Sequence, residues 1–392
     1  MHSNRLASFS LALIMGGLAA CGGGSVSGPE PAAATPAEAI DAEEKVLHVY
    51  NWPDYIAENT IAKFETQTGI KVHYTLYSNA DVLEERLRAH PDAYDVIFPT
   101  AQPHAQRMIS AGLLSKLDAG RLGNLAHIDK DILRELQNID PGNQHVAPYM
   151  WGTTGLGVNV GKARAALGSA ATLDSWGLLF DPANVSKLSS CGIGIMDNEI
   201  EALPAALIWR GLNPNDFSPE AIAAAEQAYL RIRSHVRKFG NDSELIDGLA
   251  DGSLCLVLAY SGDVQQAQVQ AGEAALAAKT PAPEIRYVIP REGAMRWMDV
   301  VAIPKQAKHV GNAHRFLQYL MQPETIADIS NHVAYANANT GADEFLDEAI
   351  AKNPGIYPPA EVRAKLHSAR QPTAAEDARR KAAWQKILYG AI

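Results

Sequence analysis

The chain has 392 residues, with 34 basic and 44 acidic side chains and a formal net charge of -10. Its composition, 47% apolar and 20% charged, excludes wholesale disorder, and its length favours two lobes of ordinary domain size. The acidic surplus argues against a nucleic-acid binder, which needs a basic face, and we expect no nucleic-acid partner. On charge alone, the surplus is compatible with a cationic ligand or simply with solubility.

Residues 1–20 have the pattern of an export signal. A short positive start ends at Arg5, and an apolar run from Leu6 to Ala20 follows that is too short to span a bilayer. The run ends Leu18-Ala19-Ala20-Cys21, which is typical of a bacterial lipoprotein signal with a lipidated cysteine. A plain signal peptide with an incidental cysteine remains the alternative. We predict a signal peptide over 1–20, and a lipidated Cys21 with a Gly-, Ala- and Pro-rich tether over 21–45.

Alternating strand and helix patterns follow the tether. The spacing of apolar residues predicts strands over 46–51, 70–76 and 94–98 and helices over 59–68, 81–89 and 106–114. This order favours an α/β sheet with right-handed crossovers. Ligands of such sheets bind at the carboxyl ends of the strands, here at 51–55 and 99–102.

A second α/β block follows a crossing segment at 147–159, whose strand we expect to start at Thr154. Its predicted elements are strands at 193–196 and 254–260, helices at 199–210, 218–234 and 243–250, strands at 285–290 and 299–303, helices near 309–320 and 323–332, and a charged helical tail over 353–392. We predict one lobe from 46–150 plus about 276–345, and another from 151–275 plus about 346–392. With an export signal and a tether, two such lobes indicate a periplasmic solute receptor that closes by a hinge motion.

Two cysteines remain after lipidation of Cys21. Cys191 and Cys255 are an even pair in an oxidising compartment, where a bridge can form. No CxxC motif occurs, so neither a zinc site nor a thioredoxin-like site is indicated.

Polar and aromatic residues gather at the expected strand ends. Most of these clusters pair a ring with a carboxylate or an amide, and they lie at 52–55, 197–201, 260–263, 297–299 and 335–339. Carboxylates form charge-assisted hydrogen bonds with ammonium groups, and aromatic faces attract cations and cover methylene chains. The combination suits an elongated amine. Taken singly, such a tryptophan more often packs in the core, and such an aspartate more often caps a helix.

Nine segments carry a family resemblance. They are YNWPDYI (50–56), FETQTGIKV (64–72), YDVIFPT (94–100), APYMWGTTGLGVN (147–159), SWGLLFDPAN (175–184), AYSGDVQQA (259–267), REGAMRWMDVVAIP (291–304), YANAN (335–339) and NPGIYPPAEVRAKL (353–366). Together they resemble the polyamine-binding receptors of bacterial ABC transporters, over about 46–390. The resemblance implies a type II periplasmic binding protein fold, α/β, with two lobes joined by crossing strands around a ligand cleft. It also implies a Cys191–Cys255 bridge.

The resemblance also implies a ligand box. The residues at the family's ligand positions are Trp52, Asp54, Tyr55, Thr100, Glu201, Tyr260, Asp263, Trp297, Asp299 and Tyr335, with Thr100 standing where the family has Ser. Pro53 departs from the family's usual Ser or Thr, and Tyr260 replaces a frequent Trp. Trp297 is typical of spermidine-preferring relatives, whereas Asp263 resembles the putrescine branch. We therefore expect both polyamines to bind, with a lean to spermidine.

Together with the lipidation motif at Cys21, the resemblance indicates a periplasmic lipoprotein that is anchored to the membrane by lipid, acts as a monomer and delivers its polyamine to an ABC permease. We expect no cofactor and no enzymatic activity, since no GxSxG, HExxH or Gly-rich phosphate loop is present. Three alternatives stay open: a secreted hydrolase, a metal-ion receptor built on the clustered acids, and a polyamine sensor with the same fold.

Overall fold

The computed structural model describes residues 43–77 and 79–390. The predicted signal peptide, Cys21 and nearly all of the predicted tether lie outside these residues. Among the described helices, none is both long enough and apolar enough to cross a membrane. Residues 43–390 belong to one compact unit.

The first α/β block begins with strand β1 (Val46–Asn51), which pairs in parallel with β2 (Lys71–Leu76) and β3 (Val96–Ile97). Its helices and helical turns are α2 (Thr60–Thr68), α3 (Ala80–Ala89), η1 (Ala101–Ala105), α4 (Gln106–Ser110), η2 (Ala119–Arg121), η3 (Gly123–His127) and α5 (Lys130–Leu136). Gly69 ends α2 in the left-handed conformation, with φ of 69°. Asn79 caps α3 by accepting a hydrogen bond from the Val82 amide at 2.9 Å.

The second block is built on strands β5 (Ile193–Met196), β6 (Lys238–Gly240) and β7 (Leu256–Tyr260). Strand β5 lies between the other two and is parallel to both. The helices of this block are α6 (Val160–Leu167), α7 (Gly177–Phe180), α8 (Pro182–Leu188), α9 (Glu199–Trp209), α10 (Pro219–Ile232), η4 (Arg233–His235), α11 (Asp242–Ala250) and α12 (Ser261–Ala278). Helices α9, α11 and α12 each follow one of the three parallel strands.

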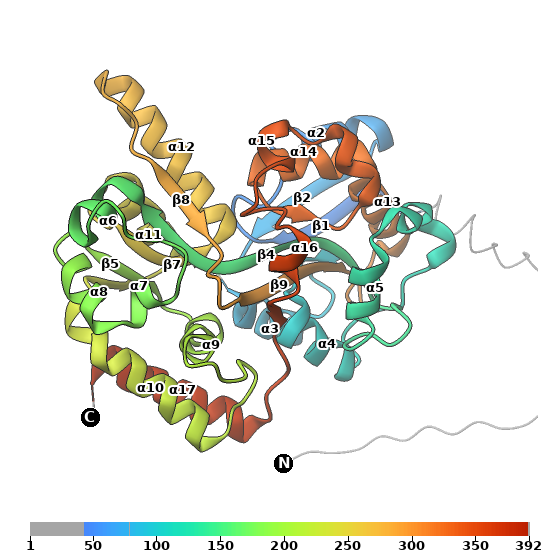
Figure 1. Cartoon of the computed structure of the whole chain (residues 1–392). Coiled ribbons are helices and arrows are strands. Elements are labelled where there is room, and N and C mark those ends of the chain that lie inside the picture. Colours follow the sequence, from blue (N-terminus) through green and yellow to red (C-terminus); the bar gives the residue numbers. More distant parts are fainter. Residues whose placement is uncertain (1–42, 78, 391–392) are drawn as a thin grey trace, which may run out of the picture. The chain divides into compact units, whose positions relative to one another are not determined.

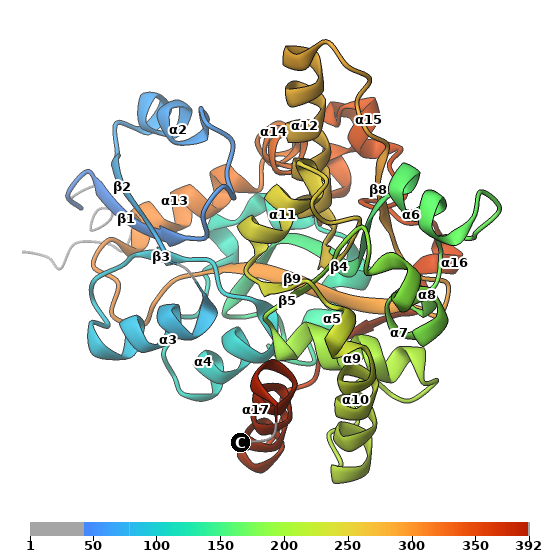
Figure 2. The same ribbon diagram turned by 90° about the vertical axis from the view of Figure 1, so that its left-hand side faces the viewer.

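Two long antiparallel strands join the blocks and run side by side through the middle of both views (Figures 1 and 2). They are β4 (Val146–Asn159), which is buried along its whole length, and β9 (Ala294–Ala302). The sheet order is β2-β1-β3-β9-β4-β7-β5-β6. Three further strands pair with the two long ones: β8 (Ile285–Val288), β10 (Ala336–Asn337) and β11 (Leu366–Ser368).

The C-terminal part returns to both blocks. Its helical elements are α13 (Val310–Leu320), α14 (Pro323–Val333), η5 (Thr340–Phe345), α15 (Glu348–Ala351), α16 (Ala360–Arg363) and α17 (Ala374–Tyr389). Helices α13 and α14 pack on the core that contains β1, whereas α17 lies beside α10 of the second block (Figure 1). The last helix is thereby placed next to the segment that follows β5.

Apolar side chains form separate cores for the two blocks. One cluster surrounds Leu258 of β7 and includes Trp384 of α17. Two others lie around β1 and β3, and they include Phe64, Tyr149 and Val300. Ile285 of β8 and Met295, near the start of β9, pack in the core of the second block. The division into two lobes at residues 150, 275 and 345 stays a prediction.

The structure differs from the expected elements at several boundaries. Strand β4 starts at Val146 rather than Thr154, and β9 starts at Ala294 rather than Asp299, because the two strands pair with each other and hold each other extended. The tail is not helical throughout, because strand β11 lies between α16 and α17 in the sequence and pairs with β9. Strand β6 was not predicted, because its three residues are too few to show a period.

The predicted bridge between Cys191 and Cys255 is present, with the Cα atoms 5.5 Å apart. Cys255 is fully buried, and it directly precedes β7. The bridge therefore ties the start of β7 to the turn that precedes β5.

We predict that replacing both cysteines (Cys191→Ala with Cys255→Ala) lowers the free energy of unfolding by about 4 kcal/mol, because the bridge closes a stretch with a sequence separation of 64. Denaturant unfolding of the two proteins measures the difference. Alkylation of the unreduced protein followed by mass spectrometry is the control. Two labelled thiols in that sample would show that the bridge is not formed.

Candidate functional site

Two buried carboxylates stand at the carboxyl ends of parallel strands. Glu201 is in the first turn of α9, after β5, and Asp263 is in the first turn of α12, after β7. Both are 8% exposed. Because β5 pairs directly with β7, the two helices begin at the same edge of the sheet. Asn198 caps α9, and its side-chain amide donates a hydrogen bond to the Tyr260 hydroxyl at 3.1 Å.

A third buried carboxylate belongs to the long strand pair. Asp299 lies in β9 opposite Met150 of β4 and forms an isolated bridge with Thr100 on its other side. Burial raises the pKa of Asp299 to about 6, while the hydroxyls of Thr100 and Tyr55 oppose this shift. The Tyr55 hydroxyl faces the carboxylate without closing a well-formed hydrogen bond, and Asp299 Oδ1 has no partner among the described residues.

Only one of the two carboxylate oxygens of Asp263 has a hydrogen-bond partner among the described residues. The Tyr335 hydroxyl donates a hydrogen bond to Asp263 Oδ1 at 2.9 Å, whereas Oδ2 is buried without a partner in the described part of the chain. Burial, and next the negative charge of Asp242, raise the pKa of Asp263 well above its usual value. A donor that carries positive charge would satisfy Oδ2 and favour the ionised form.

More neighbouring groups stabilise the charge of Glu201 than the charges of Asp263 and Asp299. Thr154 of β4 donates its hydroxyl to Glu201 Oε2 at 2.6 Å. Burial raises the pKa of Glu201 to about 7, and the Thr154 hydrogen bond and the charge of Arg380 work in the opposite direction. Arg380 belongs to α17 and is 3% exposed, so a helix near the C-terminus supplies a cation close to this carboxylate.

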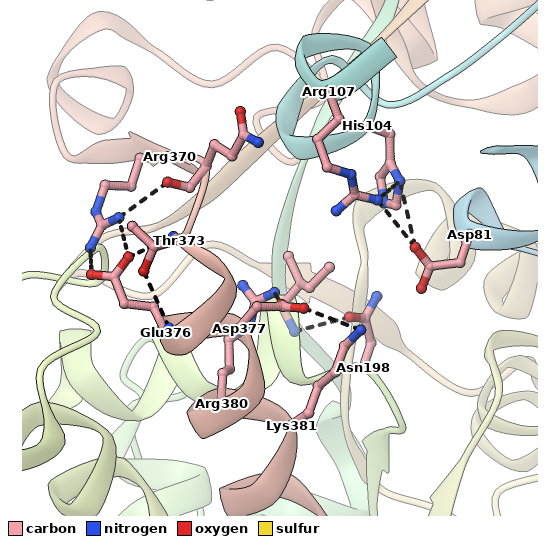
Figure 3. A network of polar contacts seen from close by, with 12 residues as sticks. Asp81, His104, Arg107, Asn198, Arg370, Thr373, Glu376, Asp377, Arg380 and Lys381 are labelled. Carbon is pink, nitrogen blue, oxygen red and sulfur yellow. Dashed lines mark hydrogen bonds and ion pairs between the residues drawn. The ribbon is translucent and has the colours of Figure 1, made fainter. Parts of the chain in front are cut away.

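Helix α17 also holds the segment that carries Glu201. The Trp384 indole donates a hydrogen bond to Asp197 Oδ1 at 2.7 Å. On the same helix, Arg380 and Lys381 share Asp377 at 2.6 and 3.2 Å (Figure 3). The two cations of this group outnumber its one carboxylate, and the charge of Arg380 lowers the pKa of Glu201.

Aromatic rings join the carboxylates. Trp297 contacts Tyr335 and Tyr260, with ring centroids 4.9 and 5.6 Å apart, and Tyr55 contacts Tyr335 at 5.8 Å. All three contacts are edge-to-face, an arrangement that leaves ring faces available. We name Tyr55, Glu201, Tyr260, Asp263, Trp297, Asp299 and Tyr335 the acidic-aromatic cluster.

Two glycines make room for these rings. A Cβ atom on Gly152 of β4 would collide with the Trp297 ring, and one on Gly262 of α12 would collide with the Tyr335 ring. Because a side chain at either position would displace a ring, the close packing of the cluster depends on both glycines.

Within the described chain, no hydrogen bond or ring contact joins two of the predicted site residues, Trp52 and Asp54, directly to the cluster, although Trp52 packs against the same apolar core as Tyr55 and Tyr335. The Trp52 indole donates a hydrogen bond to the Phe98 carbonyl at 3.0 Å, and its ring packs on Tyr77 at 4.5 Å. Asp54 is exposed and has a positive φ of 49°. No hydrogen bond or ion pair joins Asp54 to the cluster within residues 43–77 and 79–390. Thr100 is the remaining predicted residue, and it lies beside Asp299.

Sequence reasoning missed three residues that act on the cluster: Thr154, Asp242 and Arg380. Thr154 lies within residues 147–159, one of the segments that carry the family resemblance, but nothing in the sequence paired it with Glu201. Asp242 follows the unpredicted strand β6.

Among the described residues, no group of three or more His, Cys, Asp or Glu has an arrangement that could hold a metal ion.

Comparison with known proteins identifies the family. Residues 59–358 match the family model for a bacterial extracellular solute-binding protein. The chain is 42% identical over 349 residues to the putrescine-binding periplasmic protein SpuD of Pseudomonas aeruginosa, covering 89% of this chain and 93% of that one. It is 40% identical over 352 residues to the putrescine-binding periplasmic protein PotF of Escherichia coli, covering 90% and 93%.

A solved structure supports the fold. The spermidine/putrescine ABC transporter substrate-binding protein PotD of Streptococcus pneumoniae superposes with a TM-score of 0.74 at 22% identity, covering 88% of this chain and 99% of that one. The type II periplasmic binding protein fold expected from the sequence is thereby confirmed. The family model and the two sequence relatives describe binding proteins rather than enzymes. The chain belongs to the family of bacterial extracellular solute-binding proteins.

Proposed function

We propose that the chain captures a small aliphatic polyamine in the acidic-aromatic cluster and delivers it to an ABC permease. The observation that carries this proposal is the pair of buried carboxylate oxygens without a partner among the described residues, Asp299 Oδ1 and Asp263 Oδ2. A buried carboxylate needs a donor and a countercharge, and an ammonium group supplies both.

The surrounding rings suit the rest of such a ligand. The faces of Trp297, Tyr260 and Tyr335 can cover methylene groups and attract an ammonium group at the same time. The Trp297 Nε1 donor is buried without a partner in the described chain, and an ammonium group would not satisfy it. We therefore assign the role of Trp297 to its ring face.

The relatives support the ligand class and the compartment. The two reported relatives at 40–42% identity are named as putrescine-binding periplasmic proteins, so putrescine is the first ligand to test and the periplasm the proposed location. We also propose that the protein binds its ligand as a monomer. The comparisons give no support to the metal-receptor and sensor alternatives.

We predict that Asp299→Asn weakens putrescine binding by about two to three decades. Removing one partner of a desolvated charge pair costs ~3–5 kcal/mol, at about 1.4 kcal/mol per decade. Isothermal titration calorimetry measures the change. Asp131→Asn is the matched control, because it removes the same charge from a side chain that is 81% exposed, and it should leave binding unchanged. A loss below about threefold for Asp299→Asn would place the binding site elsewhere.

We predict that affinity falls as the pH is lowered from 8 to 5. The pKa values of Asp299 and Glu201 are about 6 and 7, and an ammonium group requires the ionised forms. Protonation of each group weakens binding by about one decade per pH unit below its pKa, so we expect a loss of about one to three decades. Calorimetry at several pH values tests this, and an affinity that stays constant over the range would contradict it.

The same pKa values determine whether the stability of the ligand-free protein rises or falls with pH. Both carboxyls bind protons more tightly in the folded chain than in the unfolded chain. Their contribution to the free energy of unfolding therefore increases as the pH falls through 7 and 6. This trend is opposite to the trend in affinity, so the two measurements separate weaker binding from unfolding.

We further propose that Cys21 carries the lipid that anchors the protein, on the evidence of Leu18-Ala19-Ala20-Cys21 after an apolar run. The variant Cys21→Ser should move the protein from the membrane fraction to the soluble periplasmic fraction. Fractionation followed by immunoblotting tests this. Retention of the variant in the membrane fraction would show that another feature holds the protein there.

A further inference from the structure

One more carboxylate stands at the same edge of the sheet. Asp242 is the first residue of α11 and follows β6 directly. Strand β6 pairs in parallel with β5, with Met196 opposite Gly240, and the Asp197 amide donates to the Gly240 carbonyl at 2.9 Å. Three neighbouring parallel strands therefore each lead into a helix that has a carboxylate in its first turn: Glu201, Asp242 and Asp263.

Asp242 stands in the first turn of α11, where its charge interacts favourably with the helix dipole, but it takes no part in the hydrogen-bonded cap of that helix. Asn241 caps α11, and it forms a capping box with Glu244 through hydrogen bonds of 3.0 and 3.1 Å. Lys238, the nearby cation, pairs with Glu244 at 2.7 Å. No hydrogen bond or ion pair of the Asp242 carboxylate occurs in the described chain, and the cap does not depend on it.

Electrostatic effects tie Asp242 to the cluster. After burial itself, the Asp242 charge contributes to the raised pKa values of Asp263, Glu201, Tyr260 and Tyr335. Asp242 has an exposed surface, yet burial raises its own pKa. Because the side chain is exposed, a ligand can reach this carboxylate.

The charges of the described residues around the cluster do not balance for a diamine. Of the four carboxylates, those of Glu201, Asp242, Asp263 and Asp299, within the described chain only Glu201 has a nearby cation, Arg380, which is itself paired with Asp377, so at least three negative charges remain. A diamine neutralises two of them. Asp263 Oδ2, on a side chain that is 8% exposed, lacks a partner among the described residues and marks this edge as a place for a donor.

We propose that Asp242 binds the additional ammonium group of a polyamine with three charges, of the spermidine type, and so sets the preference for ligand length. The proposal rests on the proposed function and deepens it: Asp263 and Asp299 hold a diamine, and Asp242 extends the acidic side of the site beyond them. A ligand with three ammonium groups then neutralises the three remaining charges.

The test is calorimetric titration of putrescine and spermidine against the wild-type protein and Asp242→Asn. The variant should lose about tenfold or more in spermidine affinity, as expected for the loss of a charge-assisted hydrogen bond, and keep putrescine affinity within about threefold. Asp247→Asn is the matched control, because it removes the same charge from an exposed position on the same helix. This control should change neither affinity.

Two results would overturn the assignment: a loss of spermidine affinity below about threefold, or an equal loss for both ligands, which would mean that Asp242 acts only through the general field of the cluster. The variant Asp242→Glu, which keeps the charge, should regain spermidine affinity relative to Asp242→Asn. If Asp242→Asn does not fold, Asp242→Ser gives the same comparison. Failure of the wild-type protein to bind either ligand would instead contradict the proposed function itself.

Discussion

The cluster is governed by the burial of carboxylates that the described chain does not neutralise. Neither Asp263 nor Asp299 has an ion-pair partner among the described residues, and each has one oxygen without a hydrogen bond. A charge in this state is unfavourable, so the pKa of each group rises until the neutral form competes with the ionised one. In the ligand-free protein Asp263 therefore favours its protonated form, whereas Asp299, with a pKa of about 6, binds a proton only below that pH; a bound ammonium group would favour the ionised form of both.

The long strand pair positions the carboxylates of the cluster. The register of β4 against β9 sets Met150 opposite Asp299 and Gly152 opposite Trp297, so the backbone ladder fixes where the central carboxylate and ring lie. Thr154, further along β4, reaches Glu201 of the second block. One strand therefore touches carboxylates from both blocks, and a shift of one residue in its register would turn these side chains to the other face of the sheet.

Local patterns in the sequence were enough for the strands and helices with a clear period, among them β1, α2, β5, α13 and α14. The resemblance to the family named all seven residues of the cluster. The features that neither the local patterns nor the resemblance predicted depend on contacts between residues that are distant in sequence. The starts of β4 and β9 depend on their mutual pairing, and Arg380 acts on a residue almost half the chain away. Asp242 was missed because β6 has three residues and therefore no period. The resemblance also implies Trp52 and Asp54 as ligand residues, and their part in the site stays a prediction.

The unequal support of the carboxylates has a consequence for selectivity. Glu201 has both a hydroxyl donor and a nearby arginine, so part of its charge is already compensated without a ligand. Asp263 and Asp299 have hydroxyl neighbours but no cation, so a bound ammonium group gains most there. A neutral ligand of the same shape would leave both charges unpaired, or would require both groups to stay protonated. The preference for cations therefore follows from the missing countercharge at Asp263 and Asp299, and the aromatic rings add the fit to the methylene chain.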